Sequence, residues 1–122
     1  MFMVFRENTR TKLWKGFAFL AGIAALYHLV GVFYPVNDAP KWRHLLFVLV
    51  NVFCVYGFIQ RPGYFLIIFA ALLVQQFYSH GTGLIKTWTE TGQIHWISVC
   101  VLVLLPIAML CLLYDYKAKK NL

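Results

Sequence analysis

The residues best suited to chemistry in this chain are its four histidines, His28, His44, His80 and His95. A neutral imidazole binds transition metals and haem iron, and it transfers protons near neutral pH. No two of these histidines are three or four residues apart, so no helix presents a pair on adjacent turns. The chain also lacks a Glu-x-x-His motif. A metal or haem site would therefore need ligands from several helices.

Uncharged polar residues accompany the histidines within otherwise apolar stretches. Polar groups in a membrane span are costly unless they face other helices or a hydrated cavity. We therefore expect a cofactor-binding pocket lined by His28, Asn51, Gln75, Gln76 and Ser98. At its mouth we expect a transition-metal site that draws on His28, His44, His80, His95, Asp38 and Glu90.

Three roles are open for His28. It could hydrogen-bond across the helices to Asn51, Gln75 or Gln76, it could ligate a metal or haem, or it could transfer protons beside a quinone or another substrate. At ~1.5 Å per residue, it would lie about 9 Å below the outer end of its helix. The other histidines are expected a turn or more higher, which argues against a haem held by two histidines.

Four apolar stretches must position these side chains, over 13–34, 44–60, 62–79 and 95–114. Their lengths are close to the ~17–25 residues of a membrane-spanning helix. The chain is 61% hydrophobic and 12% charged, and its mean hydropathy is +0.71. Gly81 and Gly83 are expected to end the third helix and to leave a loop over 81–94. The prediction is a single-domain, all-α, antiparallel four-helix bundle integral to the membrane, covering residues 1–122.

Small residues follow one face of the first stretch. Its small residues are three and four residues apart, a spacing that lets membrane helices approach closely: Ala18, Ala21, Gly22, Ala24 and Ala25. The three cysteines fall inside predicted helices without a C-x-x-C motif, which indicates small apolar residues and no disulfide framework.

The net charge of +7 predicts the orientation. Three basic residues, Lys41, Arg43 and Lys86, fall in the two longer loops. The other eight fall on the opposite side: Arg6, Arg10, Lys12, Lys15, Arg61, Lys117, Lys119 and Lys120. By the positive-inside rule both termini are cytoplasmic, and we expect a multi-pass protein of a prokaryotic inner membrane. The basic tail is interpreted as a topology anchor, with attraction to anionic lipid as the alternative. The basic residues form no stripe interleaved with stacking aromatics, so the sequence does not indicate binding of nucleic acid.

Two classes of function follow from these features. The favoured one is a small non-catalytic subunit or accessory protein of a membrane complex, which binds a cofactor, metal or lipid beside other subunits or copies of itself. The alternative is a small metal- or haem-dependent membrane oxidoreductase that uses the histidine cluster. Whether the protein is an enzyme stays open at this point.

Overall fold

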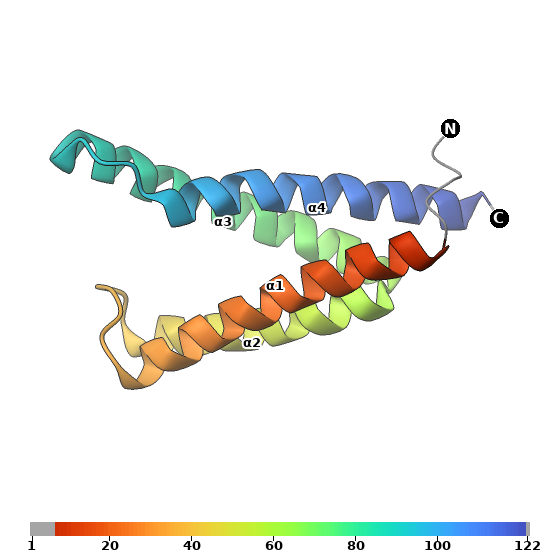
Figure 1. The fold of residues 1–122 in the computed structure, drawn as a ribbon, viewed down its shortest axis with the longest axis horizontal. Coiled ribbons are helices and arrows are strands. Elements are labelled where there is room, and N and C mark those ends of the chain that lie inside the picture. The colour runs from red at the N-terminus through yellow and green to blue at the C-terminus, as the bar shows by residue number, and fades with distance from the viewer. Residues whose placement is uncertain (1–6, 122) are drawn as a thin grey trace. The chain divides into compact units, whose positions relative to one another are not determined.

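The fold is known from a computed structural model, which describes residues 7–121. Over these residues the regular structure is entirely helical (Figure 1). The helices are α1 (Glu7–Phe33), α2 (Lys41–Gln60), α3 (Gly63–Thr91) and α4 (Trp96–Lys120). The all-α prediction is therefore confirmed. Four expected boundaries shift outward: α1 begins at Glu7, α2 begins at Lys41, α3 continues to Thr91, and α4 continues to Lys120.

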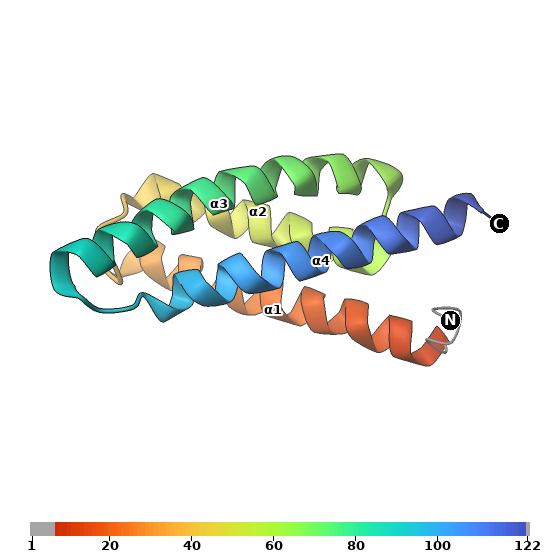
Figure 2. The same cartoon turned by 90° about the horizontal axis from the view of Figure 1, so that it is seen from above.

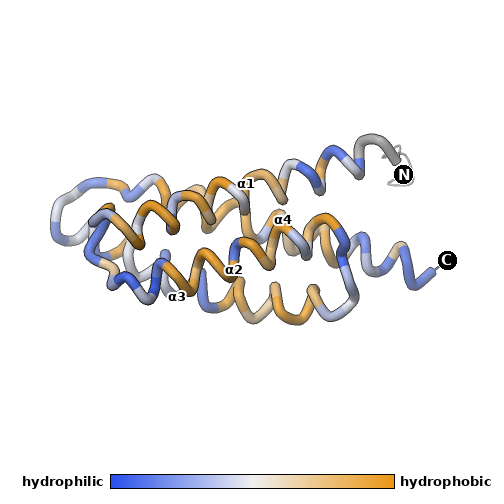
Figure 3. Tube along the Cα trace, turned by 90° about the horizontal axis from the view of Figure 1, so that it is seen from below, coloured by the Kyte–Doolittle hydropathy of each residue, from blue (hydrophilic) through white to orange (hydrophobic). Residues whose placement is uncertain are grey.

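Each helix is long and apolar enough to cross a membrane. Figure 3 shows hydrophobic residues along the middle of the helices and hydrophilic residues toward their ends. Continuous helices satisfy their backbone hydrogen bonds internally, which is what a segment in hydrocarbon requires. The structure thus agrees with four spanning segments, and the orientation and the bundle arrangement stay predictions.

Backbone contacts divide the chain into two compact units, Met1–Arg61 and Pro62–Leu122. The first contains α1 and α2, and the second contains α3 and α4. Within each unit the two helices lie side by side and run in opposite directions (Figures 1 and 2). Each unit is therefore a helical hairpin. The expected single domain stays a prediction.

Small residues and an aromatic cluster hold the first unit together. Of the predicted small residues, Ala18, Ala21 and Ala25 are buried, and Gly22 and Ala24 are half-buried. Near the Gln60 end of α2, the buried rings of Trp14 and Phe58 stack with centroids 6.1 Å apart. Close approach of the backbones and ring packing replace the hydrophobic drive that lipid does not supply.

The second unit packs through larger side chains. Phe65 and Phe69 of α3 are 1% exposed, and their ring centroids are 5.7 Å apart. Ala108 and Leu112 are the buried apolar residues of α4. Phe65 and Phe69 are four residues apart, and so are Ala108 and Leu112. That spacing places each pair on one face of its helix.

The expected end of the third helix at 79 is wrong. The helix α3 passes through Gly81 and Gly83 and stops only at Gly92, which has φ +67° and donates its N–H to Trp88 O. A glycine inside a helix costs about 1 kcal/mol relative to alanine. An interrupted backbone in an apolar setting costs more, because its polar groups lose their partners. The stop falls at the glycine that adopts the left-handed conformation.

The longer α3 changes the course of the following connection. The last turns of α3 extend past the first residue of α4, and residues 92–95 bring the chain back (Figures 1 and 2). Thr82 and Thr91 fit this helical segment because their hydroxyls donate to carbonyls one turn earlier, Tyr78 O and Thr87 O. This return places the start of α4 beside the middle of α3.

Candidate functional site

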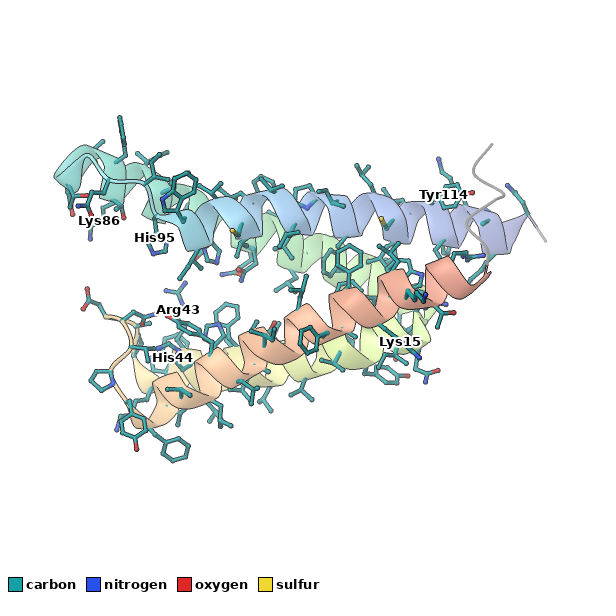
Figure 4. The ribbon with its side chains drawn as sticks, viewed as in Figure 1. Lys15, Arg43, His44, Lys86, His95 and Tyr114 are labelled. Atoms are coloured by element: carbon teal, nitrogen blue, oxygen red, sulfur yellow. The ribbon has the colours of Figure 1, made fainter. Side chains whose placement is uncertain are left out.

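The structure joins the four histidines into two sets, one in each unit. His28 of α1 contacts His44 of α2, and we call these two residues the first imidazole pair. His80 of α3 and His95, just before α4, both contact Ser98, and we call these three residues the second imidazole set. Figure 4 labels His44 at the loop end of the first unit and His95 at the start of α4.

The first imidazole pair is joined directly through ring nitrogens. Nδ1 of His28 lies 3.0 Å from Nδ1 of His44, and Nε2 of His44 lies 3.1 Å from Oδ1 of Asn37. The same Asn37 oxygen accepts the backbone N–H of Ala39 at 2.9 Å, and the Asn37 amide nitrogen donates to the Tyr27 hydroxyl at 3.1 Å. A chain of hydrogen bonds thus links α1, the α1–α2 loop and α2.

The proton positions in this chain follow from Asn37. Its Oδ1 must be an acceptor because a backbone N–H donates to it, so Nε2 of His44 carries the proton of that bond. A neutral His44 then has its lone pair on Nδ1, and Nδ1–H of His28 donates to it. Neutral His28 consequently carries its lone pair on Nε2. The pair has one consistent order of protons.

Close packing fixes the position of the His44 ring. His44 is 2% exposed, and a Cβ added to Gly31 would lie 2.5 Å from its Nδ1. Real Cβ atoms essentially never come that close, so only glycine at position 31 leaves room for the ring. The ring of its partner His28 stacks on Phe47 with a centroid distance of 5.2 Å and an interplanar angle of 24°.

The expected depth difference between these two histidines is wrong. His28 lies five residues before the end of α1, and His44 lies three residues after the start of α2. At ~1.5 Å per residue, these positions are about 7.5 and about 4.5 Å inside their helices. The prediction failed because it began the second helix at 44, whereas α2 begins at Lys41 after Pro40. The two rings can therefore meet.

The second imidazole set centres on the Ser98 hydroxyl. Ser98 is 2% exposed, and its Oγ lies 3.0 Å from Nδ1 of His80 and 2.7 Å from Nδ1 of His95. The His95 ring also caps α4, because its Nδ1 accepts the backbone N–H of Ser98 at 3.3 Å. One serine therefore connects the beginning of α4 to α3.

The cap determines the direction of the other two bonds. Since a backbone N–H can only donate, Nδ1 of His95 must carry a lone pair. The Ser98 hydroxyl then donates to His95, and its oxygen accepts Nδ1–H of His80. The order of donation runs from His80 through Ser98 to His95. Reversing it would remove the cap of α4.

The other predicted site residues do not join these clusters through their hydrogen bonds. Asn51 donates its amide to Phe47 O one turn earlier in α2, at 2.8 Å. Gln76 donates to Oε1 of its neighbour Gln75 at 2.6 Å. Asp38 and Glu90 are exposed. Of the expected pocket residues, His28 belongs to the first imidazole pair and Ser98 to the second imidazole set, and the other three belong to neither.

The chemistry of this arrangement is that of imidazoles hydrogen-bonded to each other directly or through a serine hydroxyl. Among the side chains that the structure describes, residues 10–121, no three of His, Cys, Asp or Glu gather closely enough to hold a metal ion. The expected metal ligands His28 and His44 lie in one unit, and His80 and His95 lie in the other. What the contacts do provide is a directed hydrogen bond between helices, which fixes both the ring orientations and the helix register.

Three residues of the first cluster, Tyr27, Gly31 and Asn37, were not anticipated. Gly31 follows His28 by three residues, so it lies on the same face of α1, and that spacing was a usable signal. Asn37 lies in a turn sequence, and nothing in the sequence indicates that its amide reaches His44.

No family model, no curated protein and no solved structure matches the chain.

Proposed function

We propose that this protein is a small, non-catalytic subunit or accessory protein of a larger membrane complex. The observation that carries the proposal is the internal use of the histidines. The first imidazole pair links α1 to α2, and the second imidazole set links α3 to α4. Each helical hairpin is thus held together near its loop by hydrogen bonds of its histidines, and such hairpins can serve as a scaffold for neighbouring helices.

The exposed helix faces support a partner in the membrane. Buried residues make up 22% of the apolar window in α1, 22% in α2, 11% in α3 and 17% in α4. Gln75 is exposed within the span of α3. An amide facing hydrocarbon is unfavourable, and a polar side chain of a partner helix would bind it. We therefore assign the Gln75 face of α3 to a transmembrane helix of the larger complex.

The proposed placement is a prokaryotic inner membrane, with both termini in the cytoplasm and the loops around Asn37 and Gln93 outside. A membrane-impermeant maleimide tests this after Cys54, Cys100 and Cys111 are replaced by Ala. We expect labelling of Gln93→Cys in intact cells, and labelling of Asn121→Cys only after permeabilisation, because both residues are exposed at opposite ends of α4. Labelling of both from the same side would refute the four-span topology.

The accessory role is tested by the mass of the native complex. After mild detergent extraction, we expect the chain to migrate with one other membrane protein in fixed stoichiometry. Gln75→Leu should release the chain from that complex, because it removes the polar contact while leaving α3 apolar. Ile67→Leu, at a position that is 73% exposed, should leave the complex intact.

Other outcomes of this measurement would replace the proposal. If both variants stay in the complex, the assigned face is contradicted. A complex made only of this chain would indicate a homo-oligomer. A haem absorption band or a stoichiometric metal, lost in both His28→Ala and His95→Ala, would favour the metal- or haem-dependent oxidoreductase. Elemental analysis and a visible spectrum of the purified chain provide that comparison.

A further inference from the structure

One face of α1 combines two exposed lysines with a continuous apolar surface. Successive positions on a helix are 100° apart, so residues three and four apart share a face. On this face every residue is exposed, and Phe19 is 68%, Ile23 48% and Leu26 63% exposed. We call it the α1 lipid face, and it consists of Lys12, Lys15, Gly16, Phe19, Ile23 and Leu26.

This face points away from the partner helix in the same unit. The buried apolar side chains of α1 lie on the opposite side of the helix from the α1 lipid face: Trp14, Ala18, Ala21 and Ala25. The face is therefore separate from the α1–α2 contact and from the first imidazole pair. Figure 4 labels Lys15 on the N-terminal part of α1.

The charges and the space on this face match a phospholipid. Lys12 and Lys15 are one turn apart, which places two ammonium groups within reach of one phosphate. No acidic residue occurs between Lys12 and Leu26. A Cβ at Gly16 would meet nothing within 4 Å, so the backbone there leaves a gap between the lysines and Phe19.

The length of the face also fits an acyl chain. From Lys15 to Leu26 the helix rises about 16 Å, which is close to half of the ~30 Å hydrocarbon thickness of a bilayer. Lysines at the end of a span extend toward the headgroup layer while their stems stay on apolar surface. A single lipid can thus place its headgroup at the lysines and one chain along the helix.

We propose that the α1 lipid face is a binding site for one anionic phospholipid. The phosphate lies between Lys12 and Lys15, and an acyl chain packs in the gap at Gly16 and along Phe19, Ile23 and Leu26. The site requires that α1 spans a membrane. It does not require a partner protein, so it stands apart from the accessory role.

Native mass spectrometry of the purified chain tests the site. The probes are phosphatidylglycerol and phosphatidylcholine with identical acyl chains, and glycerol phosphate as a soluble headgroup. We expect one bound phosphatidylglycerol and an affinity about tenfold higher than for phosphatidylcholine, and Lys12→Gln/Lys15→Gln should remove this preference. Glycerol phosphate should not compete at lipid concentrations, because it lacks the chain.

Two further variants separate a local site from general attraction. Lys117→Gln/Lys120→Gln removes the same charge from exposed positions of α4, and it should leave phosphatidylglycerol binding unchanged. Gly16→Leu keeps every charge and fills the gap, so it should weaken binding about fivefold. Circular dichroism and elution volume confirm that each variant is folded.

Three results would overturn the site. The first is equal binding of the two lipids by the wild-type chain. The second is an equal loss of binding in both double-lysine variants, which would indicate attraction spread over all basic residues. The third is displacement of the lipid by glycerol phosphate, which would indicate a phosphate site without a chain-binding groove. Each is measured on the isolated chain, so failure of the accessory role leaves the result readable.

Discussion

Gly31→Ala should lower the free energy of unfolding by about 1–3 kcal/mol, the usual penalty for overpacking a buried site. The added methyl would lie 2.5–2.7 Å from three atoms of the His44 ring, so either the ring or α1 must shift. A shifted ring loses its 3.0 Å contact with His28. The measurement is reversible unfolding of the detergent-solubilised protein by SDS titration.

Gly22→Ala is the matched control for this variant. Gly22 also lies inside α1, but a Cβ there meets nothing within 4 Å. Since alanine favours helix over glycine, this variant should be neutral or more stable by up to about 1 kcal/mol. Equal destabilisation by both substitutions would show that loss of glycine itself, and not the His44 contact, is responsible.

A double-mutant cycle isolates the contact further. His44→Ala alone should destabilise the protein because it removes a buried ring and its two hydrogen bonds. With that ring absent, Gly31→Ala no longer meets an obstacle. The penalty of Gly31→Ala should therefore nearly vanish in the His44→Ala background, an interaction energy of about 1–3 kcal/mol. Additive penalties would contradict the packing described here.

Ser98→Ala should lower the free energy of unfolding by about 1–3 kcal/mol. The substitution removes the hydroxyl that accepts from His80 and donates to His95. It leaves the hydrogen bond from the backbone N–H of residue 98 to Nδ1 of His95 in place. The link between α3 and α4 is lost while the cap is kept. SDS titration measures the stability, and nitrogen NMR shifts of the two imidazoles report the altered hydrogen bonds.

Thr82→Ala is the control for the loss of a hydroxyl. Its hydroxyl donates only to carbonyls of its own helix, Tyr78 O and Ser79 O, so its removal should change stability by no more than about 0.5 kcal/mol. Combining Ser98→Ala with His80→Phe should cost less than the sum of the two single changes, by about 0.6–1.7 kcal/mol. Strict additivity would show that the two side chains do not interact.

The regular structure was largely readable from the sequence, and the exceptions have a common cause. Long apolar runs require internally satisfied backbones, which makes helices the expected element. Helix ends depend on smaller terms. Gly81 and Gly83 resemble a stop, but α3 ends at a left-handed residue, and of these three glycines only Gly92 adopts that conformation. At the Lys41 end of α2, Pro40 begins the helix before its strongly apolar part.

The candidate site divides in the same way. Residue types alone indicated that His28, His44, His80, His95 and Ser98 carry the polar chemistry of the chain. Their partners depended on where the helices begin and end, which the sequence did not predict correctly for α2 and α3. The start of α2 at Lys41 brings His44 to His28, and the return of the chain after α3 brings Ser98 to His80.

The sequence by itself determined four apolar helices, the small-residue face of α1 and the types of side chain available for chemistry, because composition and spacing act within one helix. Only the tertiary structure decided that the histidines are held in pairs inside separate hairpins. That outcome depends on the space left by Gly31 and on the reach of Asn37, which are contacts across a loop. Spacing along α1 places Gly31 on the face of His28, but it does not show which residues of the loop and of α2 meet that face.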